Sequence, residues 1–128
     1  MENQEEKLIN EIRSLFEELI EEEKERFDIA TMRTIYPRSF VYVSKAKELF
    51  AKAVELEKIN SEYNTYGLKD VMGDEVDMVD RYEYEYKKNS LTPKAKSITK
   101  IQNLMYDASY HIKLYFYKVI NMKFSVLI

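Results

Sequence analysis

The 128-residue chain has no cysteine, one histidine and two glycines, and each shortage excludes a class of site. Without cysteine there is no disulfide framework, no thiolate metal site and no thiol nucleophile. Two glycines cannot build a loop that cradles phosphates, and one histidine cannot supply the two Glu-x-x-His motifs of a di-iron bundle. His111 has Asp107 one turn earlier, which favours a structural pair. We therefore predict no catalytic residues, no cofactor and no metal.

The chain also lacks a long uncharged stretch. No window of 18 residues is free of charge, and even the apolar C-terminal region includes Asp107, Lys113, Lys118 and Lys123. Such charges argue against a transmembrane span. The acidic, polar opening from Met1 to Glu6 is unlike a signal peptide. We therefore expect a cytoplasmic protein that does not enter a membrane.

The chain does have a helical hydrophobic repeat near its C-terminus. Apolar residues alternate in steps of three and four at Ile98, Ile101, Met105, Ala108, Ile112, Tyr115, Val119, Met122 and Val126. A strand repeats every two residues, so this spacing indicates one long α-helix. Thr92 and Pro93 are suitable first residues for it. We predict a helix from Pro93 to about Met122, about 45 Å long at 1.5 Å per residue.

Three earlier segments complete the predicted fold. The first helix should run from about Gln4 to Phe27, with a core face of Leu8, Ile12, Leu15 and Leu19. Because the residue before proline avoids the helical region, the chain should break at Tyr36. A second helix should then run from Arg38 to Tyr63, with core positions at Tyr42, Ala46, Leu49, Ala53 and Leu56. Residues 64–67 have the composition of a turn.

Residues 68–88 fit two structures. Leu68, Met72 and Val79 have helical spacing, although Gly73 costs about 1 kcal/mol inside a helix. Tyrosines at 82, 84 and 86 alternate with glutamates, which is typical of a half-buried strand. Residues 40–43 and 124–128 have similar β-propensity, so a small α+β fold is the alternative. We predict a single all-α domain, 1–128, that forms an antiparallel bundle of about four helices, with the long C-terminal helix as its longest member.

Charge is distributed unevenly along the chain. Residues 1–30 have ten Glu and one Asp against two Lys and two Arg, a net charge of −7. Residues 87–128 have eight Lys against one Asp, a net charge of +7. Helices of opposite charge attract, so we expect the first helix to pack along the C-terminal one. Fifteen Lys and seventeen Glu against two Gln is also the balance reported for hyperthermophiles.

From Leu104 onward the C-terminal helix is apolar on more than one face. The residues outside its main seam include Tyr106, Tyr110, Leu114, Phe116, Tyr117 and Ile120. A helix with one solvent-exposed side does not need apolar residues at these positions, so other helices or a partner must cover these residues. We therefore predict a non-catalytic protein–protein interaction or assembly protein. Its expected partner is a second copy of the chain in a symmetric homodimer.

A second hypothesis is binding to nucleic acid. Eleven tyrosines offer stacking surfaces, and a basic patch is formed by Lys87, Lys88, Lys94, Lys96 and Lys100, with Lys45, Lys47 and Lys52 on the second helix. Arginine, which reads phosphates and bases better than lysine, occurs five times and never in these clusters. The hypothesis predicts binding that weakens steeply with salt.

A third hypothesis is an enzyme that uses Mg²⁺. Two acidic rows occur at helical spacing, Glu17, Glu18 and Glu21 in the form E-E-x-x-E, and Asp74, Asp77 and Asp80. Two facing rows can hold Mg²⁺ through carboxylate oxygens. The pattern resembles the all-α nucleoside triphosphate pyrophosphohydrolases of the MazG type, although no glutamate leads the second row here. The resemblance implies Mg²⁺-dependent release of pyrophosphate, lost in Glu18→Gln.

Overall fold

The computed structural model describes residues 3–28, 32–73, 79–81, 83–84, 87–88 and 95–122, without the side chains of 25–28, 32–39 and 95–98. Within these ranges every regular element is helical and none is a strand. The elements are α1 (Gln4–Asp28), α2 (Met32–Ile59), α3 (Tyr66–Val71), α5 (Ala95–Leu114) and the π-helical η1 (Tyr115–Ile120), which continues α5. The predicted all-α class is confirmed.

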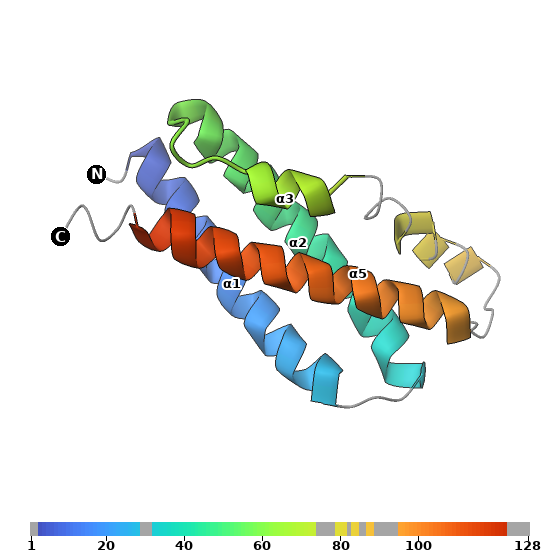
Figure 1. Ribbon diagram of the computed structural model, residues 1–128. Coiled ribbons are helices and arrows are strands. Elements are labelled where there is room, and N and C mark those ends of the chain that lie inside the picture. The colour runs from blue at the N-terminus through green and yellow to red at the C-terminus, as the bar shows by residue number, and fades with distance from the viewer. Residues whose placement is uncertain are drawn as a thin grey trace.

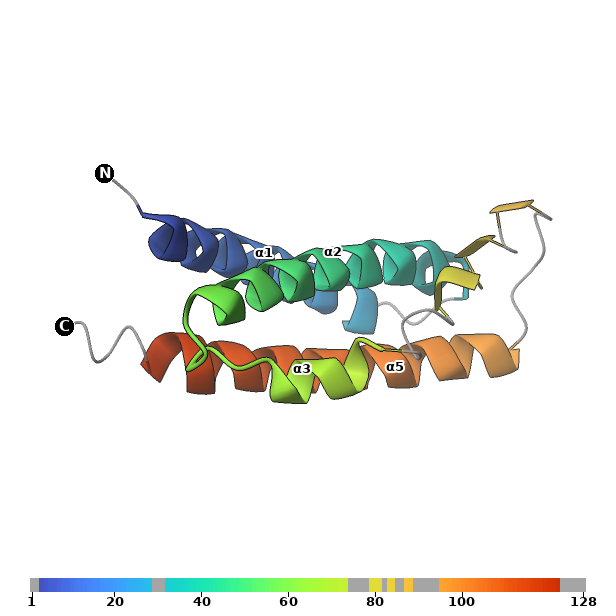
Figure 2. The same ribbon diagram turned by 90° about the horizontal axis from the view of Figure 1, so that it is seen from above.

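The helices form two layers (Figures 1 and 2). In one layer α1 and α2 run antiparallel; in the other, α5 lies across this pair with α3 beside it. Because α3 first carries the chain back toward the opposite end, α5 runs in the same general direction as α2. α1 is therefore antiparallel to both α2 and α5, as predicted for a bundle, whereas α2 and α5 are roughly parallel to each other.

The core lies where these layers meet. The predicted face of α1, Leu8 to Leu19, is buried, with every position at most 7% exposed. The predicted face of α2 is buried against it, and the small side chains of Ala46 and Ala53 allow close approach. Each fully buried aliphatic side chain contributes roughly 1.5–3 kcal/mol of transfer free energy. Burial of these faces therefore accounts for the pairing of α1 with α2.

α2 begins before the expected proline break. It starts at Met32, so Pro37 is its sixth residue and the predicted start at Arg38 is wrong. Proline lacks the N–H that would bond the carbonyl four residues earlier, which costs one backbone hydrogen bond. The apolar face that begins at Phe40 outweighs that single loss. α2 has 28 residues, and the helix of α5, η1 and residues 121–122 is described over the same number, so within the described residues neither is longer.

α2 also ends earlier than predicted, at Ile59. The Oδ1 atom of Asn60 accepts a hydrogen bond from the backbone N–H of Glu62 at 3.0 Å, a local turn that competes with the helix. The buried Thr65 donates its backbone N–H to Glu57 Oε2 at 2.7 Å, which holds the loop against α2. The turn therefore occupies residues 60–65, and the predicted turn at 64–67 is displaced because residue 66 begins α3.

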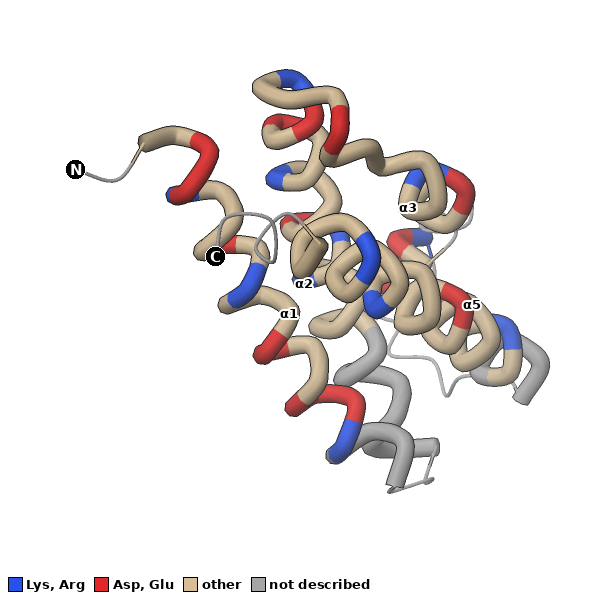
Figure 3. The backbone as a smooth tube through the Cα atoms, turned by 60° about the vertical axis from the view of Figure 1, so that its left-hand side comes forward, with Lys and Arg blue, Asp and Glu red and all other residues tan. Residues whose placement is uncertain are grey.

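The acidic side chains of α1 pair mainly with α2. Lys52 Nζ lies 2.8 Å from Glu11 Oε2, and Lys45 lies near two further glutamates of α1. From α5, Lys113 is the one described lysine that pairs with α1, at 3.0 Å from Glu23. The expectation that α1 packs along the C-terminal helix is therefore wrong in its main part. Figure 3 shows both signs of charge on α1, α2 and α5.

The C-terminal repeat changes register at Tyr115. Its positions from Ile101 to Tyr115 are buried as predicted, but Met122 is 62% exposed and Ile120 takes its place in the core. Residues five apart are about 140° apart around an α-helix, whereas the wider π turn brings Tyr115 and Ile120 onto one face. The Asn121 N–H accordingly bonds the carbonyl of Phe116, five residues earlier. The assumption of an unbroken repeat is therefore wrong at Met122, whereas Val119 still packs against the core in part.

Some predicted features lie outside the described residues. These are the helix start at Thr92 and Pro93, Val126, the side chain of Ile98, and the proposed strand at 124–128. Residues 79–81, 83–84 and 87–88 are helical, as are residues 40–43 within α2. The strand interpretation is therefore wrong at all of these positions.

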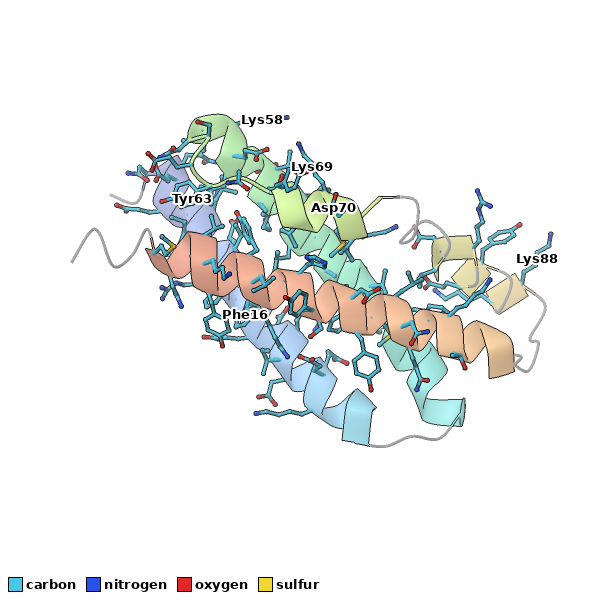
Figure 4. All side chains as sticks on the ribbon, viewed as in Figure 1. Phe16, Lys58, Tyr63, Lys69, Asp70 and Lys88 are labelled. Carbon is cyan, nitrogen blue, oxygen red and sulfur yellow. The ribbon has the colours of Figure 1, made fainter. Side chains whose placement is uncertain are left out.

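Tyr63 connects the end of α2 to the start of α1. Its hydroxyl donates to Glu5 Oε1 at 2.9 Å, and its side chain is almost completely buried (Figure 4). Burial, together with the hydrogen bond and the charge of Glu5, raises the pKa of Tyr63 to about 12. The folded state therefore favours the neutral phenol.

The π turn predicts unequal effects of two truncations. Ile120→Ala should lower the free energy of unfolding by about 2–5 kcal/mol, because it leaves a cavity in the core. Met122→Ala should change it by less than about 0.5 kcal/mol, because that side chain is mostly exposed. Urea denaturation of both variants measures the difference. Equal losses would show that the α-helical repeat continues through residue 122.

Tyr63→Phe should lower the free energy of unfolding by about 1–2 kcal/mol at neutral pH, because Glu5 loses its donor. The raised pKa of Tyr63 stabilises the fold below pH 10, and that contribution is lost as the pH rises toward about 12. The variant should therefore lose less stability than the wild type between those pH values. Tyr66→Phe, at an exposed tyrosine, is the matched control. Identical alkaline profiles for Tyr63→Phe and the wild type would contradict the assignment.

Candidate interaction surface

The helix formed by α5 and η1 carries a row of exposed tyrosines, and the ring of Tyr117 also meets that of Phe16 on α1 edge-on. Tyr106, Tyr110 and Tyr117 are 53%, 61% and 56% exposed. Leu114 is half-buried between them in the sequence, and Met122 follows. We call these five residues the outer face of α5–η1. Large aromatic side chains this exposed, gathered on one helix face, distinguish it from the buried faces of α1 and α2.

The opposite side of the same helix holds this face in position. Ile101, Met105, Ala108 and Ile112 are buried in the core at three- and four-residue spacing. Tyr106 follows Met105 by one position and Tyr110 follows Ala108 by two, which turns them about 100° and 200° around the α-helix from those buried residues. The tyrosines are therefore exposed as a consequence of the seam that buries their neighbours.

Two contacts with α1 fix the rotation of α5–η1 about its axis. The Glu23 carboxylate accepts hydrogen bonds from Ser109 Oγ at 2.6 Å and from Lys113 Nζ at 3.0 Å. Farther along, the ring of Phe16 stacks on that of Phe116, with centroids 4.0 Å apart and planes 1° from parallel. Figure 4 shows Phe16 where α1 passes behind α5. A rotation that buried the tyrosines would break both contacts.

The six predicted interaction residues divide into two groups. Tyr106, Tyr110 and Tyr117 are exposed, and Leu114 is partly so. Ile120 is completely buried, so its assignment to an interaction face is wrong, and the π turn is the reason. Phe116 is partly buried in an aromatic cluster with Phe16, the edge of Tyr117 and the Arg13 guanidinium. Its first role is therefore to hold η1 on α1.

Sequence reasoning missed Met122 as a surface residue, because the regular repeat placed it in the seam. A polar rim was missed as well: Asn103, Asp107 and Lys118 are exposed beside the tyrosines. The expected pair between Asp107 and His111 is wrong, because no hydrogen bond joins them in the part of the chain described. His111 instead lies against α3, where a Cβ added to Gly67 would meet its Nδ1 at 3.4 Å.

The predicted lysine patch is described in part. Lys87 pairs with Glu83 at 2.8 Å, Lys88 lies 5.4 Å from the centre of the Tyr84 ring, and Lys100 is exposed. Lys94 and the side chain of Lys96 lie outside the described residues. On α2, the three lysines of the expected patch, Lys45, Lys47 and Lys52, all form ion pairs with carboxylates. The α2 lysines are therefore not a free basic surface.

The two acidic rows are also only partly described. Glu18 and Glu22 lie 3.8 and 3.9 Å from Lys45, and Asp80 pairs with Lys47. Among the residues described, no three histidine, aspartate or glutamate side chains gather closely enough to hold a metal ion. Asp74 and Asp77 lie outside them, so the hypothesis of a magnesium enzyme stays a prediction.

An open groove of about 640 Å³ runs between α1 and α2, lined by Lys7, Glu11, Glu48 and Lys52 among others. A hydrogen bond from Lys52 lowers the pKa of Glu11, and the same bond raises the pKa of Lys52. Both groups therefore remain charged near neutral pH and neutralise each other. The mixed charges of the lining select no class of ligand.

No protein-family model, curated protein or solved structure matches this chain. Function must therefore be argued from its own geometry. Within the described residues, no helix has both the length and the hydropathy that a bilayer crossing requires.

Exposure of the tyrosines predicts that the fold does not depend on them. The double variant Tyr106→Ser, Tyr110→Ser should change the free energy of unfolding by less than about 1 kcal/mol, because serine and tyrosine have similar helix propensities. Ile112→Ala, on the buried side of the same helix, should lose about 2–5 kcal/mol. Urea denaturation compares them. A serine variant as unstable as Ile112→Ala would show that these tyrosines belong to the core.

Proposed function

We propose that this chain is a non-catalytic, helical protein–protein interaction and assembly protein that docks a partner on the outer face of α5–η1. The observation that carries the proposal is the exposure of Tyr106, Tyr110 and Tyr117 on a helix whose other side is buried. The proposal includes the cytoplasmic, homo-oligomeric setting expected from the sequence.

Tyrosine suits this role for two physical reasons. It is enriched at interface cores, where its ring offers a large apolar area and its hydroxyl reaches a polar group. It also loses little conformational freedom on binding, because only two side-chain torsions need to be fixed. The outer face is held in place by the core and by contacts with Glu23 and Phe16. Because the helix is already fixed, less conformational entropy is lost when a partner binds to this face.

Single-stranded nucleic acid is the second candidate. Lys100 and Lys118 are exposed along the same helix, and tyrosines stack well on bases. The acidic neighbour Asp107 and the absence of arginine from α5 and η1 make this face a weaker match for phosphate than for a protein. The protein candidate is therefore favoured.

Photo-cross-linking from within the face separates the two candidates. A benzophenone amino acid that replaces Tyr110 should give protein adducts in cells, identified by mass spectrometry. The same group in place of Val41, an exposed residue of α2, should give far fewer. Adducts with nucleic acid, or equal protein adducts from both positions, would overturn the proposal.

A further inference from the structure

The rim of the outer face carries one unpaired charge of each sign. Asp107 and Lys118 are both exposed, and neither forms an ion pair or hydrogen bond with a described residue. They are 11 positions apart, about 16 Å along a helix at 1.5 Å per residue. The midpoint between them falls between residues 112 and 113, close to Tyr110 and Leu114. Tyr106 and Tyr110 lie on one side of that point and Leu114 and Tyr117 on the other, and each pair has one of the two opposite charges beside it.

We propose that the partner covering this face is a second copy of the chain, with its α5–η1 antiparallel to the first. Asp107 of each copy then lies beside Lys118 of the other. This inference rests on the proposed function and names its partner. A two-fold axis through the midpoint makes the contact isologous, so the same ion pair forms twice.

Charge complementarity decides the orientation. A parallel pair in register would place Asp107 beside Asp107 and Lys118 beside Lys118, and like charges across a helix contact are unfavourable. The antiparallel pair replaces both repulsions with attractions. It also places Tyr106 near Tyr117 of the second copy and Tyr110 near its Leu114, so that apolar surface covers apolar surface.

The size of the face sets the expected affinity. A fully covered tyrosine buries about 150–250 Å², so three tyrosines that are half exposed offer about 300 Å² per copy. A stable interface of ordinary size uses about 800 Å² per partner, and the rest must come from Leu114, Met122 and the stems of polar residues. The contact is therefore small, and we expect a dissociation constant on the order of 10 µM.

Sedimentation velocity of the full chain at about 1–500 µM and low salt tests the ion pairs. Asp107→Lys and Lys118→Asp should each weaken dimerisation about tenfold or more, because each creates like-charge contacts. The double variant Asp107→Lys, Lys118→Asp should return to within about threefold of the wild type, because both pairs are restored with reversed signs. Asp70→Lys, an exposed aspartate of α3 outside the face, is the matched control and should have no effect.

The absence of native cysteine allows the orientation to be tested directly. Asn103→Cys and Met122→Cys, both at exposed positions, lie on opposite sides of the proposed axis. On oxidation, a mixture of the two variants should form mixed disulfide dimers, and each variant alone should not. Disulfide dimers of each variant alone would indicate parallel helices and overturn the inference.

A strictly monomeric wild type at 500 µM, or a dimer that is indifferent to both single charge reversals, would also overturn it. The proposed function fails separately. If the wild type is monomeric and the group at position 110 still cross-links to another protein, the docking face stands, and the homo-oligomeric setting and the second copy as partner are wrong. If that position yields no specific protein adduct, the proposed function itself fails.

Discussion

Everything proposed for the surface depends on the burial of one side of α5 against α2 and α1. The seam of Ile101, Met105 and Ile112 is withdrawn from water, and this supplies most of the free energy that holds the helix. Hydrogen bonds to Glu23 and the stacking of Phe16 add directional constraints that apolar burial lacks. Burial attaches the helix and these contacts set its rotation. The rotation in turn decides which side chains meet solvent.

The π turn of η1 allows two contacts to form at the end of this helix. Phe116 must reach Phe16 on α1, and a side chain of the next turn must fill the core behind it. An unbroken α-helix would present residues 119 and 122 to the core, whereas the wider turn presents Ile120 and turns Met122 to solvent. π turns are often found at functional sites, and this one extends the outer face by a residue.

The parts of the structure that sequence could predict are those governed by local spacing. The predicted range for α1 differs by one residue from the observed one, and every residue of its predicted core face is buried, since helical periodicity is visible within a few turns. Ile9, which is buried beside that face, was missed. Both ends of α2 were misjudged, because a helix continues past a proline or stops before an asparagine according to what the neighbouring turns bury. The charge totals also gave the wrong partner for α1. In the described ion pairs that α1 forms with other helices, most of its glutamates pair with Lys45 and Lys52 of α2 and not with lysines of the basic C-terminal segment.

The amino-acid sequence by itself determined the all-α class, the bounds of α1 to within one residue and the buried apolar seam from Ile101 to Tyr115. These follow from the 3.6-residue period, which is a property of the backbone and needs no partner. Only the tertiary structure decided which apolar residues of the C-terminal helix stay in water. Tyr110 and Ile120 are equally plausible core residues in the sequence, and the difference between them arises from the rotation that α1 imposes on α5 and from the extra residue in the π turn.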